Sequence, residues 1–566
     1  MQAELDLVFL WHMHQPDYRS PENGDYAQPW VYLHALKDYS DMAAHLERHA
    51  SIRAVVNFVP VLLDQIEDYV RQLSSADLRD PLLRLLCHPD PEAWTPAERR
   101  LALSTCFRSN DLLMIKPFPA YQRLRDLFLL LEGQDDRVVH YLSGSYFADL
   151  VTWYHLVWTG EAMRRQHSLL ADLMSRGAGY TLEDRLALLE LIRVTLKELI
   201  PRYRALAERG QIELSSTPYA HPLAPLLLDF HCAREAVPEL PLPQAPAYPG
   251  GRDRVDAHLC AAYSSHQSRF GAPPVGIWPA EGAVSNALLA RLAAHGCRWT
   301  SSGEAVLAHS LDRTGQGYEK ARDLYRPYQL AAAAEPLLFF RDDRLSDLIG
   351  FEYAKWHGKD AVQNFIAELD AIRQAAPKGE RPLVCIILDG ENAWEFYPYN
   401  AYYFFEGLYR GLDEHPQIHT TTFADCLADT GQMARVAVLP ELVAGSWVYG
   451  TMTTWIGDPE KNHAWELLCA AKQGYDLVIN SGRLDPASLA AAEACLTVCE
   501  SSDWFWWLGD YNPPEAVAQF EELFRRNLRR LYQLIRLSPP EVLQQPLSRG
   551  GGAPETGGTM RRSSET

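Results

Sequence analysis

Seven short apolar runs recur along the chain, and each ends in polar residues, glycine or proline. They lie at residues 5–11, 52–66, 211–223, 273–282, 295–303, 336–351 and 382–392. Segments with helical patterns separate most of these runs. Buried strands that alternate with helices are typical of a parallel α/β sheet. We therefore predict a sheet closed into a barrel, with the chemistry gathered where the strands end.

Three further segments complete the predicted organisation. Residues 61–210 are helical in pattern and far longer than one crossover helix, so we expect an insertion within a catalytic barrel of residues 1–400. Residues 401–540 are again mostly helical, and we expect them to pack on the barrel and complete the site. The composition of residues 541–566 cannot bury a core, which predicts a disordered tail.

Composition narrows the choice of partner. The 566 residues include 53 basic and 73 acidic side chains, a net charge of -20, which argues against nucleic acid or an anionic membrane as partner. The 15 Trp, 27 Tyr and 19 Phe residues fit either a large core or a sugar-binding surface. Flat rings stack on the apolar faces of sugars, and Trp and Tyr add a polar edge.

The N-terminal segment and the cysteines indicate a compartment. The start, MQAELDLVFLWHMHQ, lacks a basic region, an apolar core and a cleavage site, so we expect no signal peptide. No stretch reaches the roughly 18 apolar residues of a membrane helix. Ten cysteines without CxxC pairing indicate buried thiols in a reducing cytoplasm, with neither disulfides nor a zinc site.

Two histidines follow the first apolar run. His12 and His14 lie two residues apart, so on a strand both point to one face, and Gln15 and Pro16 close that strand. The pair is interpreted as part of a site. One alternative is a metal site, because an HxH pair at a strand end suits two imidazole ligands. His221 and Asp389 could supply further ligands, so the spacing leaves this alternative open.

A stiff loop follows the third run. TPYAHP places Tyr219 and His221 between Pro218 and Pro222. Two prolines restrict the backbone, which suits either a wall that faces the substrate or a plain rigid turn.

Two carboxylates end later runs. Glu281 follows Trp278 in GIWPAEG, and Asp389 ends the run LVCIILD. A buried carboxylate needs a partner or a use. Two of them at different strand ends are what glycoside hydrolysis requires, one to attack the anomeric carbon and one, with a raised pKa, to protonate the leaving oxygen.

Aromatic and acidic residues flank these candidates. In DGENAWEFY, Glu391 and Trp394 follow Asp389, and we expect Gly390 to permit a sharp turn and Trp394 to offer a stacking surface. The run SSDWFWWLGDYN does not have helix-stripe spacing and is either a hydrophobic plug or part of the site. Its candidate substrate-binding residues are Asp503, Trp504, Trp506 and Trp507.

Five motifs in order resemble glycoside hydrolase family 57. They are HMHQP (12–16), GQIELSSTPYAHP (210–222), GIWPAEG (276–282), LDGENAWEFY (388–397) and SDWFWWLGD (502–510). The resemblance implies an incomplete (β/α)7 barrel with a helical C-terminal part and a retaining mechanism on α-glucans. It implies Glu281 as nucleophile, Asp389 as general acid/base, and a subsite lined by His12, His14 and His221 with Trp278 nearby. No cofactor or metal is implied.

The motif forms look most like the amylopullulanase and α-amylase branch of that family. The expected substrates are starch, glycogen and maltooligosaccharides, with α-1,6 bonds as in pullulan also considered. A 4-α-glucanotransferase using the same site is the first alternative. A non-catalytic glucan-binding protein and a metal-dependent hydrolase that uses His12 and His14 are the others. The oligomeric state is not predicted.

Overall fold

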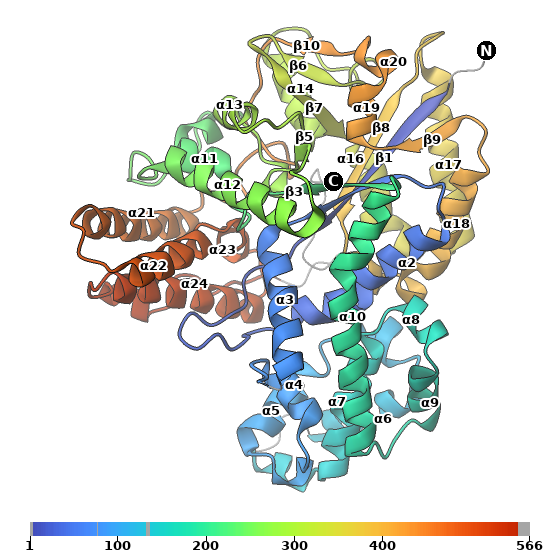
Figure 1. Ribbon diagram of the computed structural model, residues 1–566, viewed down its shortest axis with the longest axis vertical. Coiled ribbons are helices and arrows are strands. Elements are labelled where there is room, and N and C mark those ends of the chain that lie inside the picture. Colours follow the sequence, from blue (N-terminus) through green and yellow to red (C-terminus); the bar gives the residue numbers. More distant parts are fainter. Residues whose placement is uncertain (1–3, 76, 132–135, 553–566) are drawn as a thin grey trace.

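A curved parallel sheet forms the centre of the molecule (Figure 1). The computed structural model describes residues 4–75, 77–131 and 136–552. Seven parallel strands have the neighbour order β7-β5-β4-β3-β2-β1-β8. They are β1 (Leu5–Met13), β2 (Ala54–Phe58), β3 (Ile212–Ser216), β4 (Gly276–Ile277), β5 (Trp299–Gly303), β7 (Ala333–Arg341) and β8 (Leu383–Asp389). Each lies within or overlaps one predicted apolar run, which confirms the (β/α)7 barrel.

The apolar runs form strands because both faces of the sheet are buried. Every residue of β1, β2, β3 and β5 is buried. Strands covered on both faces are near-continuously apolar, as these are. The register places His12 of β1 opposite Asp389 of β8 and Asn57 of β2, all at the carboxyl ends of their strands. This places the predicted site residues at one end of the barrel.

The barrel is incomplete between β7 and β8. No ladder of paired residues joins these two strands in the described part of the chain. The main-chain N–H of Asp342 does donate to the carbonyl of Cys385, 2.8 Å away. The two strands therefore lie side by side without a regular sheet between them.

Three short strands extend the sheet beyond the predicted seven. β6 (Tyr328–Leu330) runs antiparallel to β7, and β10 (Ala437–Leu439) pairs with β6. β9 (Ile418–Thr421) pairs with the first half of β1. Two of these strands belong to the region expected to be mostly helical, where three or four residues give too short a pattern to read.

Helices cover the sheet and link its strands. They are α1 (Trp30–His34), α2 (Ser40–Arg48), α11 (Ala224–Leu228), α12 (Gly251–Phe270), α13 (Asn286–Ala294), α14 (Glu304–Arg313), α15 (Lys320–Asp323), α16 (Asp343–Asp347), α17 (Gly358–Ala375), α18 (Tyr402–Asp413), α19 (Phe423–Ala428) and α20 (Thr430–Met433).

The segment between β2 and β3 is helical. It comprises α3 (Pro60–Ser75), α4 (Pro81–Cys87), α5 (Pro96–Thr105), α6 (Pro119–Leu131), α7 (Gly144–Val157), α8 (Glu161–Gln166), α9 (Ser168–Arg176) and α10 (Leu182–Glu208). Most of these helices lie below the sheet in Figure 1, and α3 and α10 connect them to it. Their treatment as an insertion in a catalytic unit of residues 1–400 stays a proposal.

Four C-terminal helices lie beside the barrel: α21 (Pro459–Asn480), α22 (Pro486–Cys499), α23 (Ser502–Trp507) and α24 (Pro514–Leu534). The main-chain N–H of Ser502 donates to the carbonyl of His221, 2.8 Å away, so α23 begins against the loop that follows β3. These contacts are consistent with the proposed role of residues 401–540 in completing the site.

The structure corrects part of the predicted disordered tail. Residues 541–552 are described, with a short 3-10 turn at Glu541–Gln544, a buried Leu543 and hydrogen bonds from Gly551 and Gly552 to the carbonyl of Asn512. Leu543 packs into the apolar core, which the composition of the tail did not predict. The rest of the predicted disorder, 553–566, lies outside the described residues.

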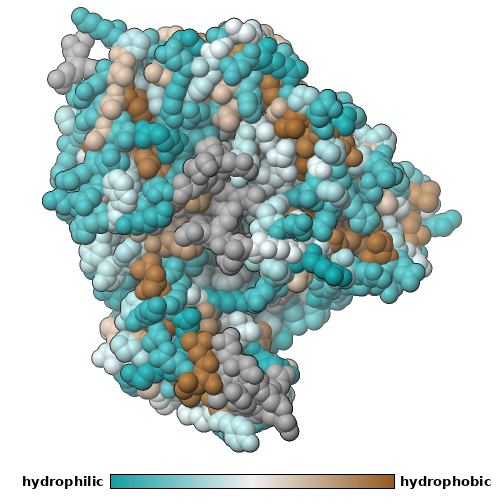
Figure 2. Space-filling model, turned by 180° about the vertical axis from the view of Figure 1, so that it is seen from behind, coloured by the Kyte–Doolittle hydropathy of each residue, from teal (hydrophilic) through white to brown (hydrophobic). Residues whose placement is uncertain are grey.

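The surface, the helices and the cysteines can be compared with the expectations about membrane spans and buried thiols. Figure 2 shows a mostly hydrophilic face with a few hydrophobic areas. Among the described residues, no helix has the length and apolar character needed to span a bilayer. All ten cysteines are free thiols, and eight are buried as expected, but Cys87 is half-buried and Cys260 is exposed.

Candidate active site

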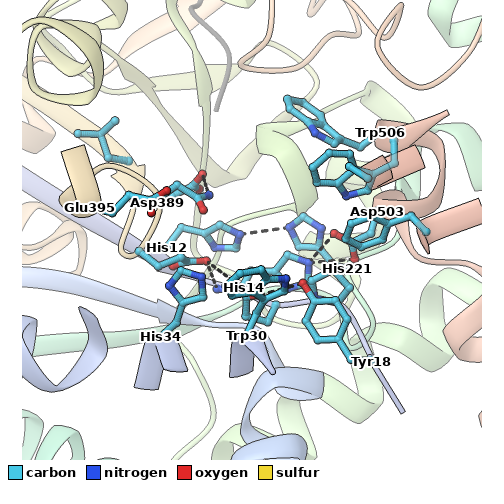
Figure 3. A pocket seen from close by; sticks show the side chains of 18 of the residues that line it. His12, His14, Tyr18, Trp30, His34, His221, Asp389, Glu395, Asp503 and Trp506 are labelled. Carbon is cyan, nitrogen blue, oxygen red and sulfur yellow. Dashed lines mark hydrogen bonds and ion pairs between the residues drawn. The ribbon is translucent and has the colours of Figure 1, made fainter. Parts of the chain in front are cut away.

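A pocket of about 580 Å³ opens at the carboxyl ends of the strands. Figure 3 shows Asp389 and Glu395 on one side of it, Trp506 and Asp503 on the other, and the histidines between them. Ten of the predicted site residues line this pocket: His12, His14, Gln15, His221, Glu281, Asp389, Glu391, Asp503, Trp506 and Trp507. They come from segments up to 495 residues apart in sequence, from His12 to Trp507.

Glu281 lies in a strained turn just after β4. Its φ of 59° and ψ of 22° are left-handed, a conformation that costs a non-glycine residue about 1–3 kcal/mol and persists where the surroundings impose it. Trp447 bonds both the main chain and the side chain of Glu281. The main-chain N–H of Trp447 donates to the Glu281 carbonyl (3.1 Å), and its indole Nε1–H donates to the carboxyl Oε2 (3.2 Å).

Asp389 is the last residue of β8 and accepts a hydrogen bond from the Asn392 amide, 2.8 Å away. Gly390 is required here for close approach. A Cβ at this position would lie 2.1 Å from Sδ of Met13, and the Gly390 N–H donates to the His12 carbonyl (2.7 Å). The glycine thus lets the end of β8 pack tightly on β1, which holds Asp389 beside His12.

Burial raises the pKa of both carboxyls, and repulsion adds to the shift at Glu281. Burial, with the charges of Asp389 and Asp503, raises the pKa of Glu281 to about 8. Burial also raises the pKa of Asp389, although the Asn392 hydrogen bond and the charges of His14 and Arg341 oppose that shift. Two interacting carboxyls do not both ionise easily, so the pair tends to keep one proton near neutral pH.

A chain of hydrogen bonds fixes the buried imidazoles. His12 Nδ1 lies 2.7 Å from Asn57 Oδ1, His12 Nε2 lies 3.2 Å from His221 Nε2, and His221 Nδ1 lies 2.7 Å from Ser502 Oγ. Since the Asn57 oxygen only accepts, Nδ1 of His12 carries a proton. His221 then donates through Nε2 and accepts the Ser502 hydroxyl proton. Burial lowers the pKa of His12 to about 3 and that of His221 well below its usual value, so both rings are neutral.

Glu391 lies buried behind the first strand. One of its oxygens accepts from the main-chain N–H of His14 and the side chain of Gln15, both at 3.3 Å. Its second oxygen, Oε2, has no hydrogen-bond partner among the described residues. Burial, with the charge of Asp389, raises the pKa of Glu391 well above its usual value.

Four predicted residues do not line the pocket. Trp394 and Trp504 are each 1% exposed, so the expected stacking surface at Trp394 is wrong. Its indole instead donates to the Gly390 carbonyl (2.7 Å), and that of Trp504 to the Val498 carbonyl (2.8 Å). Tyr219 donates to Asp64, away from the pocket. Trp278 is buried behind it, with its ring 5.2 Å from that of Trp447.

Several pocket residues were not found by the sequence reasoning. Arg341 lies within the predicted run 336–351 and Asn392 ends the run 382–392, so a polar residue in these runs could have indicated each of them. Trp447 comes from an irregular segment outside the seven predicted runs, so no comparable signal marks it. The other walls include residues from the helical insertion and α1: Trp30, His34, Arg108, Ser109, Asn110 and Trp158.

One group of described residues has the composition of a metal site. Ligand atoms of His14, His221 and Asp503 lie within 4.8 Å of one another. The two imidazoles, however, stack with ring centroids 3.9 Å apart and planes only 17° apart. A metal ion binds imidazole nitrogen near the ring plane, and two stacked rings offer no point close to both planes. His14 Nε2 instead bonds Asp503 at 3.0 Å.

The barrel and the two carboxyls that face its pocket are the arrangement that cleavage of a glycosidic bond requires. A family model described as Glycosyl hydrolase family 57 matches residues 8–439, and the chain belongs to that family. The family resemblance noted in the sequence is thereby confirmed. A comparison with curated proteins gives no match.

Solved structures share the fold. A GH57 branching enzyme from Thermococcus kodakaraensis is similar with a TM-score of 0.58 and 14% identity, over 94% of this chain and 90% of that one. A GH57-type branching enzyme from Pyrococcus horikoshii has a TM-score of 0.56, 17% identity and 97% coverage of both chains. The alpha-amylase AmyC from Thermotoga maritima has a TM-score of 0.55 and 14% identity, over 95% and 93%.

Proposed function

We propose that this chain is a retaining glycoside hydrolase that acts on α-glucans, with Glu281 as nucleophile and Asp389 as general acid/base. One observation supports this most strongly. Both carboxyls line one pocket from the ends of different strands, and burial raises the pKa of each. A retaining cycle needs one protonated and one ionised carboxyl, about 5–5.5 Å apart.

The proposed cycle has two displacements. Glu281 attacks the anomeric carbon while Asp389 gives its proton to the leaving sugar oxygen, and a glycosyl ester forms on Glu281. Asp389 then removes a proton from water, which attacks the same carbon and releases Glu281. The indole N–H of Trp447 holds Glu281 in place, and the close packing of β8 on β1 at Gly390 does the same for Asp389.

Glu391 suits a sugar hydroxyl, and the neutral imidazoles line the subsite without adding a competing charge. The ring nitrogens of His12 and His221 are already bonded within the protein, through Asn57 and Ser502. The Oε2 of Glu391 has no partner among the described residues, and because the raised pKa favours a protonated carboxyl, it can donate to a sugar hydroxyl. Trp506 and Trp507 provide half-buried rings on the opposite wall for stacking.

The forms of the five sequence motifs favour an activity of the amylopullulanase and α-amylase type. Transfer to a second glucan is the second candidate, because the similar structures include branching enzymes and a 4-alpha-glucanotransferase from Thermococcus litoralis. That last structure has a TM-score of 0.51 and 12% identity, covering 94% of this chain and 60% of that one. A cytoplasmic location remains part of the proposal.

Product analysis tests this proposal. The protein is incubated with starch, glycogen, pullulan and maltoheptaose, and the products are resolved by chain length. Shorter maltooligosaccharides with new reducing ends support hydrolysis. Longer products at constant reducing-end number support transfer. Binding without any product would support a non-catalytic glucan-binding protein, and activity lost on chelation would revive the metal-dependent alternative.

A further inference from the structure

Arg341 occupies the gap in the barrel. It is the last residue of β7 and is 3% exposed. Its Nε–H donates to the carbonyl of Ile387 on β8, 2.8 Å away and two residues before Asp389. No strand ladder joins β7 to β8 in the described chain, so this bond and the Asp342–Cys385 bond set the local spacing of the two strands.

The rest of the guanidinium is held by α16. One terminal nitrogen donates to Asp343 Oδ1 (2.7 Å) and the other to Asp347 Oδ1 (2.9 Å). A guanidinium has a planar, rigid set of donors, so three bonds in three directions fix both its place and its orientation. The side chain therefore acts as a rigid brace between α16 and β8.

The same guanidinium also lies beside Trp447, the residue that bonds the other carboxyl, Glu281. Its central carbon lies 5.6 Å from the ring centroid of Trp447. Trp447 in turn bonds Glu281 through both its indole and its main chain. Arg341 thus contacts the strand that ends in Asp389 and the ring that holds Glu281, and it lines the pocket that both carboxyls face.

We propose that Arg341 is a positioning residue that fixes the separation of Glu281 and Asp389 and supplies the positive charge that offsets their repulsion. This inference rests on the function proposed above. A second role, filling the gap in the barrel, would by itself affect stability only.

The charge argument depends on all groups that face Arg341. Asp343 and Asp347 face it from α16 and Asp389 from β8, and its charge opposes the rise in the pKa of Asp389. Glu281 lines the same pocket from the turn after β4. Glu304 of α14 lies behind them and accepts the main-chain N–H of Asp343, 3.2 Å away. All five are acidic. Loss of the guanidinium should therefore raise the pKa of Asp389 and the pH at which the carboxyl pair loses its shared proton.

The test compares Arg341→Met and Arg341→Lys with Arg344→Met. Arg344 lies on α16 beside Asp343, but it is half exposed and pairs with Glu368. We expect Arg341→Met to lower kcat on maltoheptaose by about 100-fold, the cost of a small misplacement of reacting groups. We expect its kcat/KM–pH profile to move about half a pH unit or more towards higher pH. Arg341→Lys keeps the charge without the three-way brace, so it should lose kcat with a smaller pH shift.

The outcomes separate the possible roles. An unshifted pH profile with lowered stability and unchanged kcat per folded molecule would overturn the proposal and leave Arg341 as a filler of the gap. If Arg341→Met does not fold, Arg341→Lys decides, since a wild-type kcat in this variant would equally overturn it. Addition of guanidinium ion to Arg341→Ala should restore part of the activity, whereas Arg344→Met should behave as wild type. A wild-type protein inactive on every glucan would instead contradict the proposed function.

Discussion

Glu500 is a fully buried glutamate, Glu281 is one with a side chain 12% exposed, and their surroundings are opposite. Glu500 follows α22 and accepts four close bonds, from Tyr248, from Arg254 twice and from His258, at 2.6–2.8 Å. Glu281 accepts the Trp447 indole N–H at 3.2 Å, has the Ser502 hydroxyl 3.4 Å from its other oxygen, and lies near two other carboxylates. The first is matched by the Arg254 cation and the His258 ring of α12, and the second has no such cation bonded to it.

The pKa values follow from this difference. Burial acts to raise the pKa of Glu500, but hydrogen bonds and charges from His258 and Arg254 outweigh it and lower the pKa to about 2. At Glu281 nothing outweighs burial, and the pKa rises to about 8. A matched buried carboxylate stabilises the fold, whereas an unmatched one in a pocket is a candidate for chemistry.

The substitution Glu281→Gln tests the difference between the two glutamates most strongly. We expect turnover to fall by about 10⁴-fold or more, because an amide cannot form the glycosyl ester. The thermal midpoint should stay the same or rise. The folded-state pKa is raised, so the ionised group costs stability as the pH increases from about 4.5 towards 8, and the amide removes that cost. Initial rates on maltoheptaose and calorimetry measure the two effects.

Glucan binding by the same variant is the control, since its shape is nearly unchanged. A variant that retains a substantial fraction of wild-type turnover would mean that Glu281 is not the nucleophile.

Asp389→Ala should have the next largest effect. On starch we expect a loss of about 10²–10⁴-fold, the usual contribution of an acid/base group. A glycosyl fluoride needs no proton to leave, so the variant should still form the glycosyl enzyme and then stall. Azide can attack without a base and should restore turnover with an α-azide product. A folded, glucan-binding variant that azide does not rescue would count against Asp389.

Glu500→Gln tests the other side of the comparison. Removing the charge leaves the buried Arg254 with only the more distant Glu493, 3.4 Å away, as an anionic partner, which costs up to about 3–5 kcal/mol of unfolding free energy. Turnover per folded molecule should largely persist. The folded-state pKa is depressed, so in the wild type this contribution is present above about pH 4.5 and is lost as the pH falls towards 2. Urea unfolding of both proteins across this range should converge at low pH; a constant difference would contradict the assignment.

The contrast between the carboxyls was only partly predictable from sequence. Asp389 and Glu281 could be found because each follows an apolar run, and the ends of parallel strands meet at one place. The environment of Glu281 depends on Trp447 and Asp503, which both lie more than a hundred residues downstream of it. Sequence also could not separate Trp506, in the pocket, from Trp504, two residues earlier and buried, because both positions are apolar and aromatic. The left-handed conformation of Glu281 is not signalled by its own residue type, since only the following Gly282 is a glycine.

The pH dependence of activity sharpens the comparison further. The pair should lose its shared proton as the pH rises through about 8, so kcat/KM on maltoheptaose should fall there. Asp389→Asn removes the neighbouring charge and should lower the pKa of Glu281, which can be followed with a glycosyl fluoride. A profile that is flat through this range would contradict the shared proton.

Trp447→Phe should have the smallest effect and tests the one firm donor to Glu281. The substitution keeps an aromatic ring beside Trp278 and Arg341 but removes the indole N–H that lies 3.2 Å from Oε2. A hydrogen bond to a charged group contributes about 1.5–3 kcal/mol, so we expect kcat to fall by about 10- to 100-fold. Removing a donor to the ionised carboxyl raises the pKa at which the pair loses its shared proton, so the fall in kcat/KM near pH 8 should move to higher pH. Trp506→Phe, which keeps a ring on the opposite wall, is the control and should change KM more than kcat. Equal effects of the two variants on kcat would mean that Trp447 contributes a pocket wall only, and that nothing but burial distinguishes Glu281 from Glu500.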